Sequence, residues 1–231
     1  MARRDVMKSI QSWQNRIRDP SLTVLLALQL SDIFIAAPLT AKGLPMAQVV
    51  GDTLLFAVLV TVVVLSHRWG VVILILLGLA GITVAYLFGA HWSPAVAAVL
   101  HRGGDILAFT GLSWVVGHAV YAPGRITAQR LQGAVVLYLN FATIFASAYG
   151  LIWELSPGAF ANLSAHMDVP EEVATMLYFS LTTLSTTGYG DVVAVDPFAR
   201  SLANLEAIVG QFYFAITVAR LVTLEVGNPS R

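Results

Sequence analysis

Residues 182–191 read Thr-Thr-Leu-Ser-Thr-Thr-Gly-Tyr-Gly-Asp, and this stretch lies between two apolar segments in the last quarter of the chain. Gly188 and Gly190 reach left-handed backbone conformations that cost most other residues free energy. Such conformations let successive backbone carbonyls turn to one side, where their oxygens can replace the water around a dehydrated cation. Gly-Tyr-Gly alone is typical of a surface turn. The Thr/Ser run before it, Asp191 after it and the flanking apolar segments favour a cation-binding strand.

The composition is that of a membrane protein rather than a soluble domain. Of 231 residues, 57% are hydrophobic and 11% are charged, against about 25% charged in soluble domains, and the mean hydropathy is +0.76. The formal net charge is zero, so we expect no nucleic-acid partner. The absence of cysteine excludes disulfides, thiol catalysis and Cys-ligated metals. The sequence has no phosphate-binding glycine loop or activated nucleophile, so we expect neither an enzyme nor a soluble substrate, and we expect no cleavable signal peptide.

Apolar runs and helix-start signals predict six membrane-spanning helices. Residues 1–18 combine apolar and basic side chains at helical spacing, which predicts an interfacial amphipathic helix on an anionic membrane surface, with a disordered basic tail as the alternative. Asp19-Pro20 and Ser93-Pro94 are helix-start signals for the first and fourth spans. Gly103-Gly104 predicts a break in the fourth span after a short outer helix. The expected spans are residues 20–41, 47–66, 70–89, within 94–121, 131–154 and 197–225.

A shorter helix is expected between the last two spans, over residues 170–184, with Pro170, Glu171 and Glu172 in its first turn. It would be roughly 22 Å long and cannot cross a hydrocarbon core of about 30 Å. Together with the strand 185–191 it predicts a re-entrant loop, which is tolerated at membrane depth only when it is buried in protein or lines water. The expected organisation is an interfacial helix (1–18), a four-helix domain (19–122), a linker (123–130), a C-terminal domain (131–226) and a tail (227–231).

Lysine and arginine predict the orientation, because cytoplasmic loops are enriched in both. With the N-terminus inside, the outer side receives only Lys42, Arg200 and, depending on where the fourth span begins, Arg102. Both termini are therefore expected in the cytoplasm, and residues 155–196 outside. The basic residues expected on the cytoplasmic side are Arg3, Arg4, Lys8, Arg16, Arg18, Arg68, Arg125, Arg130, Arg220 and Arg231.

The residues Ser185, Thr186, Thr187, Gly188, Tyr189, Gly190 and Asp191 together resemble the signature of potassium channel selectivity filters. The resemblance extends over residues 131–226 as a pore domain. It implies an all-α membrane protein with six transmembrane helices, a re-entrant pore helix and a filter. It also implies a homotetramer, because one strand offers carbonyls from one side only. By the same resemblance, K⁺ is bound only by filter backbone, with no cofactor, and the ion-binding residues are Thr186, Thr187, Gly188, Tyr189 and Gly190.

The resemblance also implies which residues support the filter. Tyr178 and Phe179 stand where many family members have two tryptophans, so Tyr178 is expected to bond Asp191 and hold the outer mouth; lipid or core packing is the alternative. Thr182 and Ser185 are expected to support the strand from the end of the pore helix. Glu206 lies inside the membrane, where an ionisable group is a functional candidate. It either senses charge behind the filter or makes structural hydrogen bonds.

A gate is expected on the last span. Gly210 stands where the family commonly has a hinge glycine, although close helix packing also explains such a residue. Gln211 is expected to face a water-filled cavity. Below it, Phe214, Val218 and Val222 recur at helical spacing, and we expect one of them to form an apolar constriction that closes by dewetting.

The first four spans resemble a voltage-sensing unit in number but not in charge. Voltage sensing needs several arginines, since one charge moved across 100 mV supplies only about 2.3 kcal/mol. Residues 94–121 contain only Arg102. Asp32, Asp52, Arg102 and Asp105 are possible sensor residues for protons or a ligand, with structural polar contacts as the alternative. Arg102 and Asp105 are three residues apart and are expected to pair.

The sequence therefore predicts a passive, weakly voltage-gated or voltage-independent potassium channel in a prokaryotic inner or plasma membrane, contacting lipid and three further copies of itself. Three alternatives stay open. One is a proton-coupled carrier that uses Asp32, Asp52, Asp105 and Glu206, although carriers typically show paired broken helices. The second is a non-selective cation channel, and the third is a silent subunit that modifies other channels.

Overall fold

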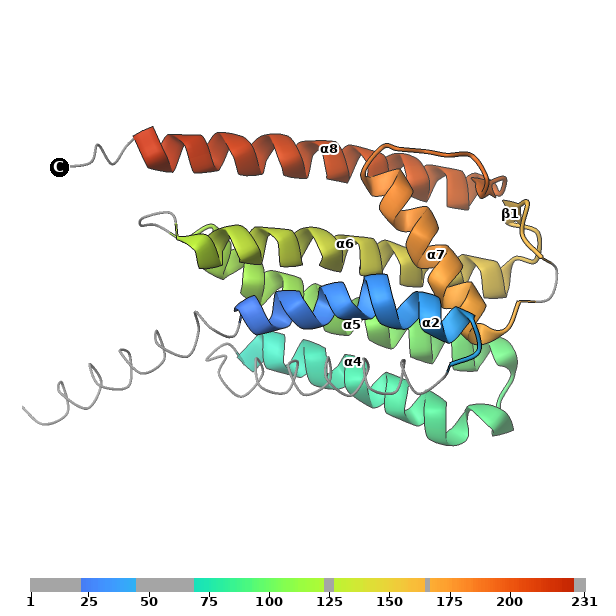
Figure 1. Cartoon of the computed structure of the whole chain (residues 1–231). Coiled ribbons are helices and arrows are strands. Elements are labelled where there is room, and N and C mark those ends of the chain that lie inside the picture. The colour runs from blue at the N-terminus through green and yellow to red at the C-terminus, as the bar shows by residue number, and fades with distance from the viewer. Residues whose placement is uncertain (1–21, 45–68, 123–126, 165–166, 227–231) are drawn as a thin grey trace, which may run out of the picture.

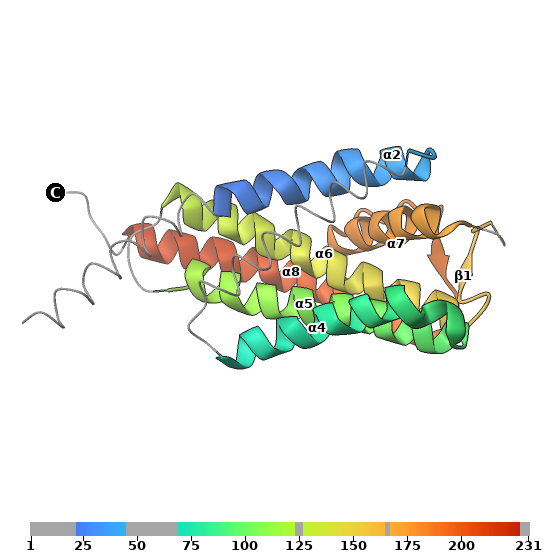
Figure 2. The ribbon, with the colours of Figure 1, turned by 90° about the horizontal axis from the view of Figure 1, so that it is seen from below.

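The structure is a computed structural model that describes residues 22–44, 69–122, 127–164 and 167–226. The expected interfacial helix at 1–18, the second span at 47–66 with Asp52, and the tail at 227–231 lie outside these residues. Long helices run roughly along one direction, and the short helix α7 (Val169–Leu184) crosses them obliquely at one end (Figure 1). Helix α7 lies at the end of the molecule away from the C-terminal end of α8, and a view turned by 90° places it at the same end (Figure 2).

The first described segment is one continuous helix with a wider turn in it. Residues 22–31 are α-helical, η1 (Asp32–Ala36) is π-helical and α2 (Ala37–Ala41) completes the segment. Pro38 has no backbone N–H, and its ring would clash with the preceding turn of a regular α-helix. A π turn, closed by the Ala37 N–H bonding the Asp32 carbonyl, accommodates such a local conflict.

The next two helices pack through small residues. They are α4 (Trp69–Phe88), followed by the short 3₁₀ turn η2 (Gly89–His91), and α5 (Pro94–Val120). The expected break at Gly103-Gly104 was wrong, because α5 is continuous. Gly104 is instead a contact residue: a Cβ there would lie 2.6 Å from the Gly78 carbonyl oxygen and 2.7 Å from Ile82 Cγ1. Close approach of two backbones through small residues is the usual packing of membrane helices.

The C-terminal half contains the remaining helices. Helix α6 (Ala128–Leu155) begins three residues before its predicted start, where Thr127 Oγ1 accepts the Arg130 N–H at 3.4 Å. Helix α7 begins at a cap in which Asp168 Oδ1 accepts the Glu171 N–H at 2.9 Å. Helix α8 (Pro197–Val226) follows Asp196, whose Oδ1 accepts the Phe198 N–H at 2.8 Å. These caps satisfy backbone donors that have no partner inside the helix.

A short strand pair was not predicted from the sequence. Strand β1 (Phe160–Ala161) pairs antiparallel with β2 (Val193–Ala194). It joins the segment between α6 and α7 to the segment between residues 182–191 and α8.

Four helical segments in the described part of the chain are long and apolar enough to cross a membrane. They are Leu22–Ala41, Trp69–His91, Ala128–Leu155 and Pro197–Arg220. Helix α5 has 27 residues but contains Arg102 and Asp105 and is not among the four. Helix α7 has 16 residues, about 24 Å, and is too short to span. The protein is therefore a helical, multi-pass membrane protein.

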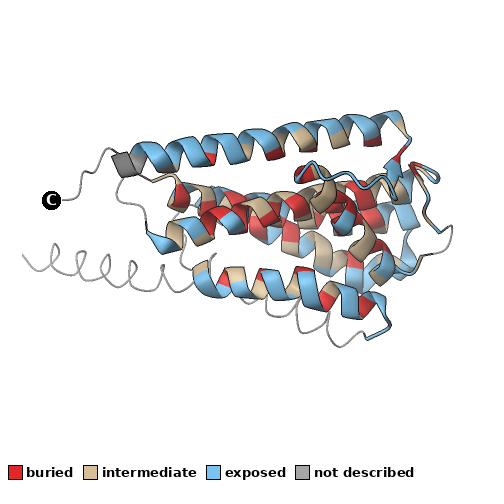
Figure 3. Ribbon diagram, turned by 45° about the horizontal axis from the view of Figure 1, so that its top comes forward, coloured by how far each residue is buried: buried red, intermediate tan, exposed pale blue. Residues whose placement is uncertain are grey.

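Two clusters of buried side chains hold the helices together. One cluster surrounds Tyr149, Phe160 and Phe179 and joins α6, α7 and the strand pair. The other surrounds Leu112 and Leu137 and joins α5 to α6. Helix α8 is mostly exposed along its length, as Figure 3 shows, so in the single chain it offers a large uncovered apolar surface.

Candidate functional site

The strand after α7 has an alternating backbone. Thr186, Gly188 and Gly190 have φ angles of 58°, 54° and 78°, whereas Thr187 and Tyr189 are not among the residues with positive φ. Alternation between left- and right-handed conformations brings successive N–H groups to one side of a strand and successive carbonyls to the other. For Thr186 a left-handed conformation is costly, so the surrounding structure must hold it.

Hydrogen bonds to the end of α7 hold the strand in this conformation. The Thr187 and Gly188 N–H groups both donate to the Thr182 carbonyl, at 2.8 and 3.2 Å, and the Thr186 N–H donates to the Thr183 carbonyl at 2.9 Å. The Ser185 and Thr187 hydroxyl oxygens lie 2.9 Å apart and share a hydrogen bond. The N–H groups of residues 186–188 therefore face the helix. All residues from Ser185 to Asp191 are exposed in the single chain, which leaves one side of the strand open to an ion.

Two tyrosines contact the C-terminal end of the strand. The Tyr178 hydroxyl donates to Asp191 Oδ2 at 2.7 Å, which is the hydrogen bond expected from the sequence, and the rings of Tyr178 and Tyr189 stack with centroids 6.3 Å apart. The hydrogen bond from Tyr178 lowers the pKa of Asp191 below its ordinary value. The same bond raises the pKa of Tyr178 to about 12. The carboxylate and the phenol thus stay in their bonded forms over the whole neutral range.

Phe179 takes the packing position next to Tyr178. It is 7% exposed, and its ring meets those of Tyr149 and Phe160 edge to face, with centroids 4.9 and 5.4 Å away. Edge-to-face pairs of this kind add stability beyond area burial. Tyr178 therefore contacts the end of the strand, and its neighbour Phe179 packs in the core.

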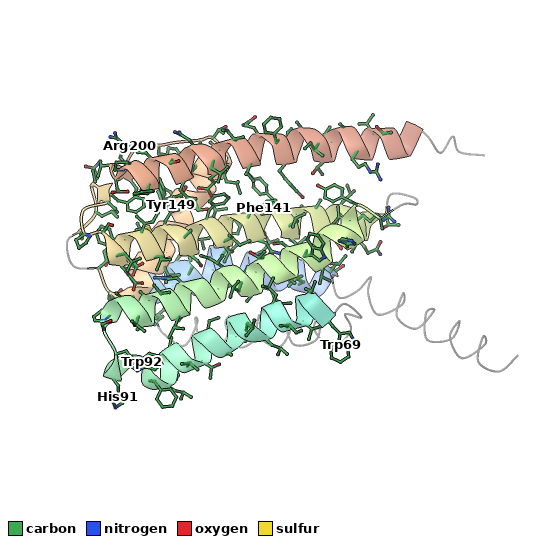
Figure 4. All side chains as sticks on the ribbon, turned by 180° about the vertical axis from the view of Figure 1, so that it is seen from behind. Trp69, His91, Trp92, Phe141, Tyr149 and Arg200 are labelled. Carbon is green, nitrogen blue, oxygen red and sulfur yellow. The ribbon has the colours of Figure 1, made fainter. Side chains whose placement is uncertain are left out.

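Glu206 lies in a closed hydrogen-bonded cluster between three helices. It is fully buried. The Tyr149 hydroxyl of α6 donates to Glu206 Oε2 at 2.6 Å, and Ser180 Oγ of α7 contacts Glu206 Oε1. Figure 4 shows Tyr149 between α6 and α8. Thr182 supports the helix end in a different way, through a 3.0 Å bond from its hydroxyl to the Phe179 carbonyl.

The expected gate residues lie along α8, which continues through Gly210 without a break. A Cβ at Gly210 would collide with the carbonyl oxygen of Leu184, at the end of α7, so this glycine has a packing role. Gln211 Nε2 donates to Thr186 Oγ1 at 3.1 Å, which connects the helix directly to the strand. The three apolar residues below it are exposed in the single chain; they are Phe214, Val218 and Val222.

The expected pairing of Arg102 with Asp105 was wrong. Arg102, 5% exposed, donates from Nη2 to Glu172 Oε1 at 2.7 Å and from Nε to Glu154 Oε1 at 3.2 Å. These partners come from α7 and α6, and Gly150 leaves the room they need, since a Cβ there would lie 2.9 Å from Arg102 Cζ. Sequence reasoning missed this contact because it connects residues 52 and 70 positions apart.

Three of the four possible sensor residues share one cavity. Asp32, Arg102 and Asp105 lie in the lining of a cavity of about 700 Å³ between the first described helix, α4, α5, α6 and α7. His101 also lines this cavity, and its Nδ1 lies 3.7 Å from Asp105 Oδ2. Asp52, the fourth candidate, lies outside the described residues. Glu206 is not in the cavity lining.

Comparison with known proteins identifies the C-terminal part of the chain. Residues 133–226 match the family described as Ion channel. A segment of 90 residues is 33% identical to the voltage-gated potassium channel Kch of Escherichia coli (strain K12), over 38% of this chain and 20% of that protein. A segment of 87 residues is 30% identical to the inward rectifier potassium channel Kirbac3.1 of Paramagnetospirillum magnetotacticum, over 36% of this chain and 25% of that protein.

The chain thus spans a quarter or less of the length of these two curated relatives. No solved structure gives a significant match. The matched segment coincides with α6, α7, the exposed strand and α8, which are the elements that build the site described above. Residues 133–226 thus match an ion channel family, and the two proteins to which this part of the chain is similar are potassium channels.

Proposed function

We propose that four copies of this chain assemble around an axis into a potassium-selective channel that conducts K⁺ passively, with residues 186–190 as the selectivity filter. The observation that carries the proposal is the alternating backbone of Thr186, Gly188 and Gly190. The N–H groups of residues 186–188 donate to carbonyls at the end of α7. A row of carbonyl oxygens on the opposite side is the ligand set that replaces the hydration shell of K⁺. The potassium channels to which the segment is similar support K⁺ as the ion.

The surfaces that one chain leaves uncovered support the proposal of a tetramer. A single strand supplies oxygens from one side only, so a complete cage requires copies related by a closed rotation. Helix α8 exposes Phe212, Phe214 and Ile216 by 63%, 70% and 57%. In the proposed tetramer these side chains of α8 are divided between contacts with neighbouring copies and the lining of the central cavity. The C-terminus of α7 points its negative dipole end toward that cavity, where it favours a cation.

Voltage dependence is proposed to be weak or absent. The arginine of α5 is held by carboxylates of α6 and α7 and is not free to move across the membrane field. One charge per subunit supplies about 2.3 kcal/mol per 100 mV, far less than several arginines. The proposed topology has six spans, with both termini in the cytoplasm of a prokaryotic inner or plasma membrane, in keeping with the distribution of Lys and Arg.

Reconstitution tests the proposal. The purified full chain in liposomes should pass K⁺ down its gradient, with reversal potentials in mixed K⁺ and Na⁺ close to the K⁺ equilibrium potential. Gly188→Ala should abolish the flux, because φ is +54° at this position in the ion-binding strand and a left-handed conformation costs a non-glycine residue roughly 1–2 kcal/mol. Gly158→Ala is the matched control: φ is +86° and a Cβ would meet nothing within 4 Å, but the residue lies outside the filter.

Loss of flux in Gly188→Ala with retention in Gly158→Ala supports the proposal, whereas equal flux in both variants contradicts it. Equal permeability to K⁺ and Na⁺ would favour a non-selective cation channel, and no flux from the wild type would favour a silent subunit. A proton-coupled carrier would acidify or alkalinise the liposome lumen as K⁺ moves. Against this alternative stands the position of Glu206, which is enclosed by Tyr149 and Ser180 away from the cavity that Asp32 and Asp105 line.

A further inference from the structure

Three short oxygen–oxygen contacts surround Glu206, but the hydroxyl groups of Tyr149 and Ser180 supply only two protons for them. Ser180 Oγ lies 2.7 Å from the Ala142 carbonyl oxygen and also in short contact with Glu206 Oε1. A serine hydroxyl has one proton to donate. The Ala142 carbonyl has none, so two short oxygen–oxygen contacts share a single serine proton.

Within the described residues, the missing proton has one available source, which is Glu206 itself. The Tyr149 hydroxyl is already committed to Glu206 Oε2, at 2.6 Å. If Glu206 is a carboxylic acid, its Oε1–H donates to Ser180 Oγ, Ser180 donates to the Ala142 carbonyl, and Tyr149 donates to Oε2. Every short contact then contains one proton. With a carboxylate, Ser180 Oγ would face either Ala142 or Glu206 lone pair to lone pair, which is repulsive and leaves a buried acceptor unsatisfied.

Among the residues that the structure describes, the surroundings of Glu206 do not compensate a negative charge. Glu206 is fully buried, and burying an ionised carboxylate is costly unless it is paired. In the described part of the chain, the titratable groups that face it are Tyr149 and Tyr138, both on α6, and neither can supply positive charge. From α7 it meets the Ser180 hydroxyl.

We propose that Glu206 is a neutral carboxylic acid at physiological pH and that its proton acts as the hydrogen-bond donor that fastens α8 to α7 behind the filter. The donor lies one helical turn before Gly210, where α8 contacts the end of α7. Glu206 is thus a positioning residue. Removal of its proton at alkaline pH would break the chain of hydrogen bonds and place a negative charge behind the pore helix. This consequence for conduction rests on the proposed potassium channel function, whereas the protonation itself does not.

Infrared spectroscopy of the purified full-length protein in liposomes tests the protonation without using ion flux. At neutral pH the wild type should show a carboxylic-acid C=O band that is absent from Glu206→Gln and retained in the control Glu171→Gln, which alters an exposed residue of α7. Alkaline titration of the wild type should replace the acid band with a carboxylate band. A wild-type spectrum at neutral pH without an acid band assignable to Glu206 overturns the proposal, whatever the flux measurements give.

Potassium flux as a function of pH tests the positioning role. Glutamine has the shape of the neutral acid and keeps a donor for Ser180 and an acceptor for Tyr149, so Glu206→Gln should rescue conduction and keep it at alkaline pH, where the wild type loses flux. Glu206→Ala leaves the Tyr149 hydroxyl unpaired and should reduce flux at every pH, by roughly tenfold. Wild type and Glu206→Gln losing flux together at alkaline pH would refute the role. A wild type that conducts no K⁺ but shows the acid band would instead refute the proposed channel function.

Discussion

The ion pairs of Arg102 define a prediction that separates structural support from voltage sensing. Its guanidinium lies 2.7 Å from Glu172, and the two side chains are 6% and 8% exposed. Arg102→Met would leave Glu172 buried without its cationic partner and beside Glu154, whose Oε1 now lies 3.2 Å from Arg102 Nε. Breaking a buried pair in this way typically costs about 3–5 kcal/mol. We expect that loss in the free energy of unfolding, measured by SDS titration in mixed micelles.

A double-mutant cycle isolates the pair. Glu172→Met leaves Arg102 with Glu154, which is 32% exposed, and should lower the free energy of unfolding by about 3 kcal/mol. The double variant should be about as stable as the wild type, because replacing a buried ion pair by apolar side chains is often neutral. Arg200→Met is the control, since Arg200 is exposed and donates to the Ala194 carbonyl; its cost should stay within about 1 kcal/mol. A cost for Arg102→Met below about 1 kcal/mol, the value of an exposed pair, or a shifted conductance–voltage curve with unchanged stability, would refute the reasoning.

Three other measurements test the contact between α8 and the end of α7, the hydrogen bond between Tyr178 and Asp191, and the proposed constriction on α8. Gly210→Ala should lower the free energy of unfolding by about 1–3 kcal/mol because its methyl group meets the Leu184 carbonyl, whereas Gly103→Ala, in open space, should be neutral or stabilising by up to about 1 kcal/mol; similar effects would contradict the packing role. Tyr178→Phe should return the pKa of Asp191 toward 3.8. Because a lowered carboxyl pKa stabilises the folded state above the unfolded value, the wild type should be more stable than this variant above pH 3.8, with the difference lost in more acid solution; parallel unfolding curves at all pH values would disprove the link. Phe214→Ala should raise K⁺ leak through the closed channel, and an unchanged basal flux would place the constriction elsewhere.

The local features of the pore region were predictable from sequence because their signals are contained in short stretches. Positive φ was expected at Gly188 and Gly190 and is found there. The short helix was expected at 170–184 and runs from Val169 to Leu184, because its Pro and acidic residues mark a first turn. The bond between Tyr178 and Asp191 followed from the resemblance and is present. The left-handed Thr186, by contrast, has no sequence signal, since bonds to the end of α7 impose it.

What the amino-acid sequence determined by itself was the membrane setting, the candidate filter and the scarcity of arginine in α5, because hydropathy, glycine spacing and composition are readable residue by residue. Only the tertiary structure decided the partners of the buried polar groups. Arg102 bonds carboxylates on α6 and α7 rather than Asp105 on its own helix, Glu206 joins Tyr149 and Ser180, and Gly104 and Gly210 are contact points between backbones. These contacts depend on which faces of distant helices meet. Helical periodicity in the sequence indicates which residues share a face of a helix, but it does not indicate which other helix packs against that face.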